Sequence, residues 1–169
     1  LAIRHNIYLP KYYDPSIANE LNALSDTCDI RSMSQLRRSK IVTYHTGVEI
    51  GKAAYGSGNI AFLRTSDFTN WEILHESKQG ISQRIFEQYV DKCALEENDI
   101  LLVRDGTYLI GSSCLVTKRD INSLFCGGLL KIHVQASDEL DPFLLLGLLN
   151  SFIVKRQIRS RQFTRDVID

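Results

Sequence analysis

The chain has 169 residues, 44% of them hydrophobic and 24% charged, with 20 basic residues balancing 20 acidic ones. This composition excludes a disordered or low-complexity protein, and the length favours one domain over residues 1–169. The longest apolar run, residues 143–149, is far shorter than the roughly 20 residues that cross a bilayer, and no secretion signal opens the chain. We therefore expect a cytoplasmic protein without a membrane partner. Because the chain begins with Leu1 and ends without a stop signal, we expect a piece of a longer protein.

The amino-terminal part predicts helices followed by a loop. Asp14 and Pro15 are a cap and a first helical position, and they predict an amphipathic helix over residues 14–25. One helical turn is expected near residues 33–36, with a short apolar step at 41–42. Four glycines within residues 45–59 predict a loop that turns several times.

The middle of the chain predicts strands, and the end predicts helices. Strands are expected at residues 60–63, 100–103, 114–117 and 129–134, with a helix capped by Ser82 between the first two. The Asp-Gly pair at 105–106 predicts a tight hairpin. A helix should begin at Asp141, break at 150–151 and be followed by a basic helix to about Arg159. The predicted class is α+β, with a mainly antiparallel or mixed twisted sheet and flanking helices at both ends.

The sequence offers little support for catalysis. The four cysteines are far apart, without a CxxC pair, and the four histidines lack metal-ligand spacing, so neither zinc nor a disulfide framework is predicted. Asp67 followed by Glu76 and Lys78 matches a metal-dependent nuclease only loosely. No Asn/Asp-Pro-Pro-aromatic motif of an amino-methyltransferase is present. We therefore predict no cofactor and no methylation by this piece, while the loose nuclease match stays open at this point.

Residues 63–71, "LRTSDFTNW", place a guanidinium, hydroxyls, a carboxylate and an amide directly after an apolar strand. This inventory can read base edges and phosphates of DNA. Equally, Ser66, Asp67, Thr69 and Asn70 can serve only to close a turn. Local sequence leaves both interpretations open.

Three ordered blocks, "GNIAFLRTSDFTNWEI", "LEENDILLVRDGTYLIGSS" and "LDPFLLLGLLNSFIVKRQIRSRQFTRDVID", resemble the DNA specificity domain of type I restriction-modification systems. Within these blocks, the segments "RTSDFTNWEI" and "LLVRDGTYLIG" are most similar to the version of the domain that is fused behind adenine-N6 DNA methylases. The resemblance runs from about Leu36 to Asp169. It departs from the family at Ala61, where proline is usual, at the loosely matching residues 125–134, and in lacking the long spacer helix that normally follows.

The resemblance implies a target recognition domain that binds double-stranded DNA sequence-specifically and is not catalytic. Its expected partners are DNA and a methylase subunit or fused methylase domain, with a restriction subunit in systems that also cleave DNA. The polar side chains at the strand ends, and the loop at residues 47–59, become the expected DNA-binding residues. These are Arg64, Thr65, Ser66, Asp67, Asn70, Arg104, Asp105, Thr107, Tyr108, Lys52 and Tyr55.

Three alternatives stay open. Arg64 and Arg104 either contact DNA or pair with a nearby aspartate and brace their loops. Trp71 is expected in the core rather than as a stacking platform. The leucine-rich helix and the basic helix after it, with Lys155, Arg156, Arg159 and Arg161, either follow phosphates or dock a partner, so a protein-interaction module is the competing function.

Overall fold

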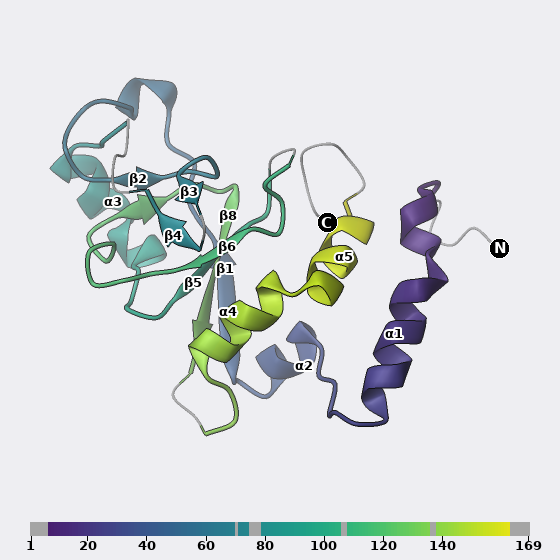
Figure 1. Ribbon diagram of the computed structural model, residues 1–169. Helices are drawn as coiled ribbons and strands as arrows, with labels where there is room; N and C mark the ends of the chain where they lie inside the picture. Colours follow the sequence, from purple (N-terminus) through teal and green to yellow (C-terminus); the bar gives the residue numbers. More distant parts are fainter. Residues whose placement is uncertain (1–6, 70, 75–78, 106–107, 136–137, 163–169) are drawn as a thin grey trace.

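The computed structural model describes residues 7–69, 71–74, 79–105, 108–135 and 138–162. Its fold is α+β, as the sequence predicts, and Figure 1 shows helices placed around a central sheet. The helices are α1 (Pro15–Ser25), α2 (Met33–Arg38), α3 (Gln83–Cys93), α4 (Pro142–Asn150) and α5 (Phe152–Ser160), with short 3-10 turns at Pro10–Tyr13 and Lys52–Ala54. The strands are β1 (Val42–Thr46), β2 (Phe62–Leu63), β3 (Phe68–Thr69), β4 (Glu72–Ile73), β5 (Ile100–Val103), β6 (Ser113–Leu115), β7 (Leu124–Phe125) and β8 (Leu129–Val134).

The main sheet has four antiparallel strands in the order β1-β8-β5-β6. A parallel pair, β2–β7, aligns Phe62 with Leu124, and a small hairpin pairs β3 with β4. Strands β5 and β8 lie where the sequence predicts them, whereas the sequence predicts neither β1 nor β7. Strand β1 alternates between polar and apolar side chains, and β7 has only two residues, so neither gives a strong local signal.

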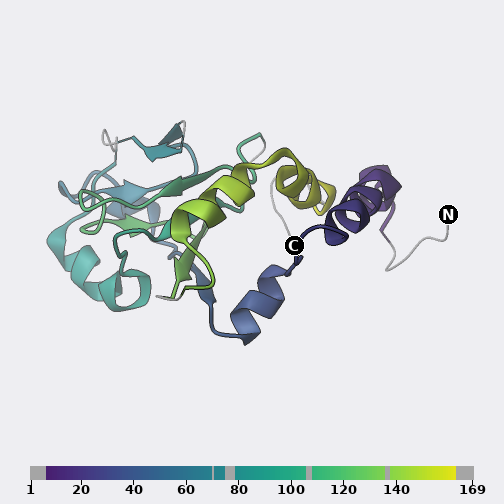
Figure 2. The same ribbon diagram turned by 60° about the horizontal axis from the view of Figure 1, so that its bottom comes forward.

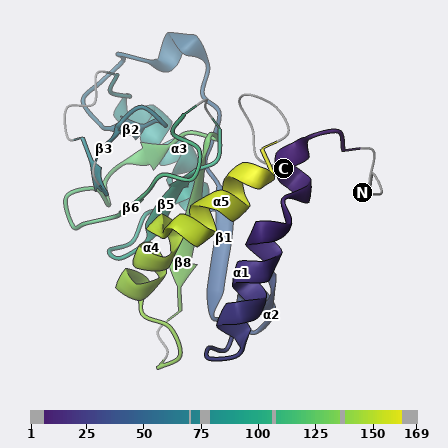
Figure 3. The same ribbon diagram turned by 45° about the vertical axis from the view of Figure 1, so that its right-hand side comes forward.

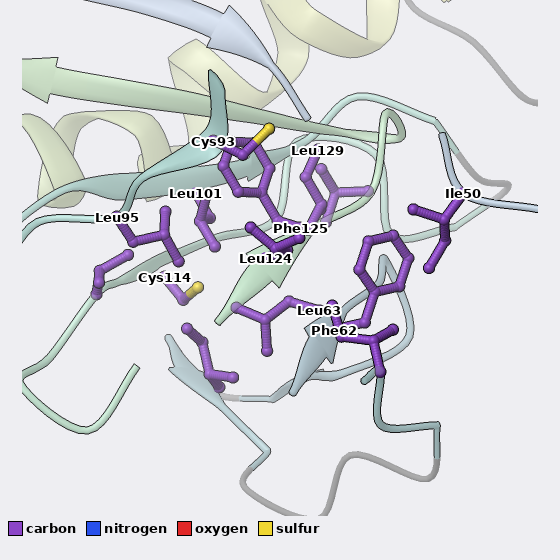
Figure 4. Close-up of a cluster of buried hydrophobic side chains, with 14 residues drawn as sticks. Ile50, Phe62, Leu63, Cys93, Leu95, Leu101, Cys114, Leu124, Phe125 and Leu129 are labelled. Carbon is purple, nitrogen blue, oxygen red and sulfur yellow. The ribbon is translucent and has the colours of Figure 1, made fainter. Parts of the chain in front are cut away.

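Two hydrophobic cores cover the two faces of the sheet. The α3-side core contains β2, β7, one face of β5 and the inner side chains of α3, and Figure 4 shows its central members. The α4-side core contains the other face of β5 with side chains of α2, α4 and α5. Leu101 and Val103 point into the first core, and Ile100 and Leu102 into the second. Burial on both faces explains why β5 is a continuous apolar run.

The predicted helix caps are largely confirmed. Asp14 accepts from the Ser16 backbone N–H at 3.0 Å, and Asp141 accepts from the N–H groups of Phe143 and Leu144 at 2.8 and 3.1 Å. The Ser82 prediction is wrong in one respect, because its side chain forms no capping bond. Instead its backbone N–H donates to the Ser57 hydroxyl at 3.0 Å, which ties α3 to the glycine-rich loop.

A buried charged cluster lies on the α3 side of β8. Asp99 is fully buried, and its carboxylate lies 3.1 Å from Lys131 Nζ and 2.7 Å from His133 Nδ1. Lys131 also donates to the carbonyl of Ala94, which caps the carboxyl end of α3, at 2.7 Å. Each buried charge thus has a charged or dipolar partner, as burial requires.

Helix α1 is attached to the rest mainly by polar contacts. It has no buried residue, and it lies beside α5, as Figures 1 and 3 both show. Arg156 of α5 lies 3.3 Å from the carboxylate of Asp14, and it also bonds Glu20 and the Ser16 hydroxyl. Seen from below in Figure 2, α4 lies across the sheet while α1 lies to one side. No helix among these residues is long and apolar enough to span a bilayer.

Candidate nucleic-acid interface

The polar cluster after β2 forms a turn that Asp67 closes with its own side chain. Asp67 is 8% exposed, and one of its carboxylate oxygens accepts from the Arg64 backbone N–H at 2.9 Å. The other oxygen accepts from the Ser66 hydroxyl at 3.2 Å. The Asp67 N–H in turn donates to the Arg64 carbonyl at 3.0 Å. Both oxygens of this carboxylate are therefore occupied inside the turn.

The same turn occurs twice more in the described part of the chain. Asp99 accepts from the Glu96 N–H at 2.7 Å, and Asp120 accepts from the Thr117 N–H at 2.8 Å. In each case the aspartate N–H also donates back to the carbonyl three residues earlier. An aspartate that caps the residue three positions before it satisfies backbone groups and fixes the turn without help from other elements.

Arg64 and Arg104 each lie beside an aspartate. Arg64 Nη2 is 3.7 Å from Asp67, and its Nη1 donates to Gln79 at 3.3 Å. Arg104 Nε is 3.7 Å from Asp105, and both side chains are more than a third exposed. The Nε of Arg64 and one carboxylate oxygen of Asp105 are buried without a hydrogen bond. Each guanidinium is therefore braced by an aspartate, which is one of the two predicted alternatives, and contact of either arginine with DNA stays a prediction.

The connection after β5 is wider than the predicted tight hairpin. Strands β5 and β6 pair antiparallel, but the last backbone bonds join Val103 to Gly111 and Ser112, so residues 104–110 form the loop. The predicted hairpin is confirmed, with a longer loop than a tight reversal, whereas the Asp-Gly turn itself falls partly outside the described residues. Gly106, Thr107 and Asn70 lie outside the described residues. Tyr108 is 75% exposed, and its carbonyl accepts from Arg159 of α5 at 2.9 Å.

The two predicted loops meet at Gly128. The N–H groups of Arg104 and Asp105 both donate to the Gly128 carbonyl, at 2.9 and 3.1 Å. A Cβ at Gly128 would lie 2.9 Å from the Thr65 methyl and 3.5 Å from Asp105 Cβ. Any larger residue here would have to displace the Thr65 methyl, so glycine lets both loops approach this closely. Segments about forty residues apart in sequence thus form one surface at the same end of the structure.

Tyr55 and Cys126 lie beside this surface. Burial raises the pKa of the Tyr55 phenol, with smaller contributions from Cys126 and Glu49, while Arg64 acts in the opposite direction. Burial likewise raises the pKa of the Cys126 thiol, against the backbone N–H groups of Gly128 and Thr65. Both groups therefore keep their protons near neutral pH. Tyr55 is half-buried against Phe62, whereas Lys52 is exposed.

Trp71 corrects the sequence prediction. It was expected in the core, yet it is 54% exposed at the turn between β3 and β4. Its φ is +74°, a left-handed conformation that is unusual for a bulky residue. The position could not be found from residue type, because an exposed and a buried tryptophan look alike in one sequence.

The basic residues of α5 have different roles. Arg156 binds the acidic groups of α1, and Arg161 lies over the Tyr12 ring, 5.1 Å from its centroid. These two hold the amino-terminal segment. Lys155 instead lines a hollow beside Trp71, and Arg159 holds the loop at residues 104–110. No cluster of three or more histidine, cysteine or acidic residues within the described ranges has the geometry to hold a metal ion.

Comparisons with known proteins add a fold likeness. No protein-family model matches this chain, and no curated protein matches it. A solved chain from work on complex assembly and conformational transition of the type I R-M system has the same fold, with a TM-score of 0.57 and 14% sequence identity. The match covers 92% of this chain and 36% of that one, so this chain spans about a third of its neighbour's length.

Proposed function

We propose that this chain is a single, non-catalytic target recognition domain that binds double-stranded DNA sequence-specifically in a restriction-modification system. The meeting of the two polar loops at Gly128 carries the proposal, because it joins two segments that were each expected to bind DNA. The fold likeness to a chain of the type I R-M system supports the setting. In the cytoplasm, the domain would direct an adenine-N6 methylase, and an associated nuclease where present, to a site that this surface selects.

In this proposal, Asp67 positions the turn, and its neighbours contact DNA. The buried carboxylate fixes the backbone at Arg64, which leaves the exposed Ser66 and half-buried Thr65 at the turn's tip. Such a turn is preorganised, so little conformational entropy is lost on binding. The charges of Arg64 and Arg104 are balanced by adjacent aspartates. Recognition of the DNA sequence therefore depends on where the hydrogen-bonding groups are placed rather than on a net positive charge of this surface.

In this proposal, the DNA phosphates are contacted by exposed lysine side chains and by the loop after β5. Lys52 extends from the glycine-rich loop, and Tyr108 from the loop after β5. A lysine that neutralises one phosphate contributes to the affinity for every sequence. We expect Lys52→Ala to weaken binding to all duplexes and to lower the salt dependence, d log K/d log[salt], by about 1. Lys11→Ala, on the amino-terminal 3-10 turn, is the control that should change neither.

Selection from a random duplex pool, followed by sequencing, tests base reading. The chain should enrich one motif, and the triple variant Arg64→Ala, Thr65→Ala, Arg104→Ala should lose that enrichment. An unchanged midpoint of urea unfolding would show that this variant is still folded. Removal of each side chain that reads a base should weaken binding to the enriched motif by about 1–3 kcal/mol. An unchanged motif from the triple variant would rule out this surface as the reading surface.

Protein docking is the second candidate function. The helices α4 and α5 expose an apolar strip of four large side chains, between 47% and 75% accessible, namely Phe143, Leu144, Leu148 and Phe152. Exposed apolar patches commonly bind other proteins. A methylase or restriction subunit would be the partner. Salt-insensitive absence of DNA binding, together with a complex that Leu148→Glu disrupts, would favour docking over base reading.

A further inference from the structure

Trp71 occupies an unfavourable position for its side chain. It lies in the two-residue turn between Thr69 and Glu72, with φ of +74°, where glycine or asparagine is usual. It is also 54% exposed, so burial does not compensate for the conformation. A strained residue that is neither buried nor suited to its turn indicates a role in binding.

A pocket of about 340 Å³ lies on one side of Trp71. Phe68 and Trp71 supply aromatic walls, and Leu109 comes from the loop after β5. The volume is at the lower end of the range for small-ligand sites, which is roughly 300–1,000 Å³. It therefore suits one flat ring system rather than an extended chain.

Polar groups line the same pocket. Asn150 donates through Nδ2 to the Ser113 hydroxyl at 2.8 Å and to the Leu146 carbonyl at 3.0 Å, so its amide presents Oδ1 as the acceptor. Ser112 adds a hydroxyl that can donate or accept. Lys155 lines the pocket and forms no ion pair with any described residue. Aromatic walls, an amide acceptor, a hydroxyl and an ammonium match a nucleobase with its phosphate.

We propose that this pocket binds one unstacked nucleobase of the DNA, with Trp71 as its stacking platform and Lys155 at its phosphate. The inference rests on the proposed function, because residues 104–112 contribute both to the reading surface and to the pocket through Leu109 and Ser112. The same DNA molecule therefore lies along both. The pocket would favour sites whose strands open or kink beside the recognition sequence.

Trp71 is the chain's only tryptophan, so tryptophan fluorescence reports on this residue, and the Lys155 and Lys118 variants distinguish the pocket from the hollow on its other side. The probes are two labelled duplexes of the enriched sequence, one fully paired and one with a single unpaired adenine. Stacking should quench Trp71 more strongly with the unpaired adenine, and that duplex should bind about tenfold tighter, the factor equivalent to 1.4 kcal/mol of stacking. Lys155→Met should reduce this preference. Lys118→Met, in the hollow on the other side of Trp71, should not.

Because Trp71→Gly removes the fluorescent side chain, its DNA binding is measured by the anisotropy of the labelled DNA. This variant should lose the preference for the duplex with the unpaired adenine and should still bind the fully paired duplex. Equal affinity and equal quenching for the two duplexes, or a preference that survives Trp71→Gly, would overturn the pocket assignment and leave duplex reading intact. Binding of neither duplex would overturn both proposals. Binding of the unpaired duplex alone would support the pocket and contradict duplex reading.

Discussion

Removing the Asp67 carboxylate should destabilise the protein measurably, because that group is buried and used within its turn. Asp67→Ala removes a 2.9 Å bond to the Arg64 N–H and a 3.2 Å bond to the Ser66 hydroxyl. A hydrogen bond to a charged group contributes about 1.5–3 kcal/mol. The 3.7 Å ion pair with Arg64, whose side chain is 29% exposed, adds about 0.5 kcal/mol at most. We expect a loss of about 2–3 kcal/mol in the free energy of unfolding, equivalent to a Tm lower by about 4–12 °C.

Urea unfolding followed by far-UV circular dichroism measures this loss, and a matched control separates stability from binding. Asp120 closes an equivalent turn, with its carboxylate 2.8 Å from the Thr117 nitrogen, away from the meeting point at Gly128. Asp120→Ala should destabilise the fold by a similar amount and leave DNA selection unchanged, whereas Asp67→Ala should impair both. A cost under about 0.5 kcal/mol for Asp67→Ala would refute the reasoning, since a buried charged acceptor cannot be removed so cheaply. Equal effects of both variants on DNA selection would refute the positioning role.

Three further outcomes concern the scaffold. Lys131→Met should lower the free energy of unfolding by about 3 kcal/mol in urea titrations, because it leaves Asp99 buried without its ammonium, and adding Asp99→Asn should recover part of the loss. Partial desolvation of the exposed His45 and the charge of Lys131 lower its pKa, while Asp99 acts in the opposite direction. The unfolded chain therefore binds more protons below about pH 6.5, and stability should fall slightly as pH drops through the folded pKa; His45→Gln should remove that small fall in titrations from pH 7 to 5. A thiol reagent at pH 8 should modify exposed Cys28 first, as peptide mapping would show, because burial raises the pKa of the other three cysteines; faster modification of any of those three would contradict the burial assigned to them.

The sequence was sufficient for elements with strong local signals. Asp14 and Asp141 mark their helices through capping, and the apolar run at β5 was identified as a strand because no polar residue interrupts it. Strand β7 could not be found, since Leu124 and Phe125 become a strand only by pairing with β2. Tertiary contacts rather than local preference define such an element.

In the candidate DNA-binding surface, too, some features could be predicted from local sequence and others depend on tertiary contacts. Residue type identified the polar segments after β2 and β5, but not whether Asp67 faces solvent or its own backbone. That choice depends on a capping bond that sequence leaves open. The approach of the two loops at Gly128 was likewise invisible, because it requires the register of β8 against β5. Trp71 was assigned to the core by its size, whereas the hairpin turns it outward.

The three turns closed by Asp67, Asp99 and Asp120 have a bearing on how such a domain diversifies. Each aspartate completes its turn through the backbone N–H three residues earlier. At the first turn the Ser66 hydroxyl also donates to the carboxylate, whereas the Thr65 side chain makes no bond to it. Thr65 lies next to the meeting point at Gly128. A substitution at Thr65 therefore leaves the hydrogen bonds of the Asp67 carboxylate in place. Under the proposed function, a change of target preference at this position requires a single substitution that keeps the turn folded.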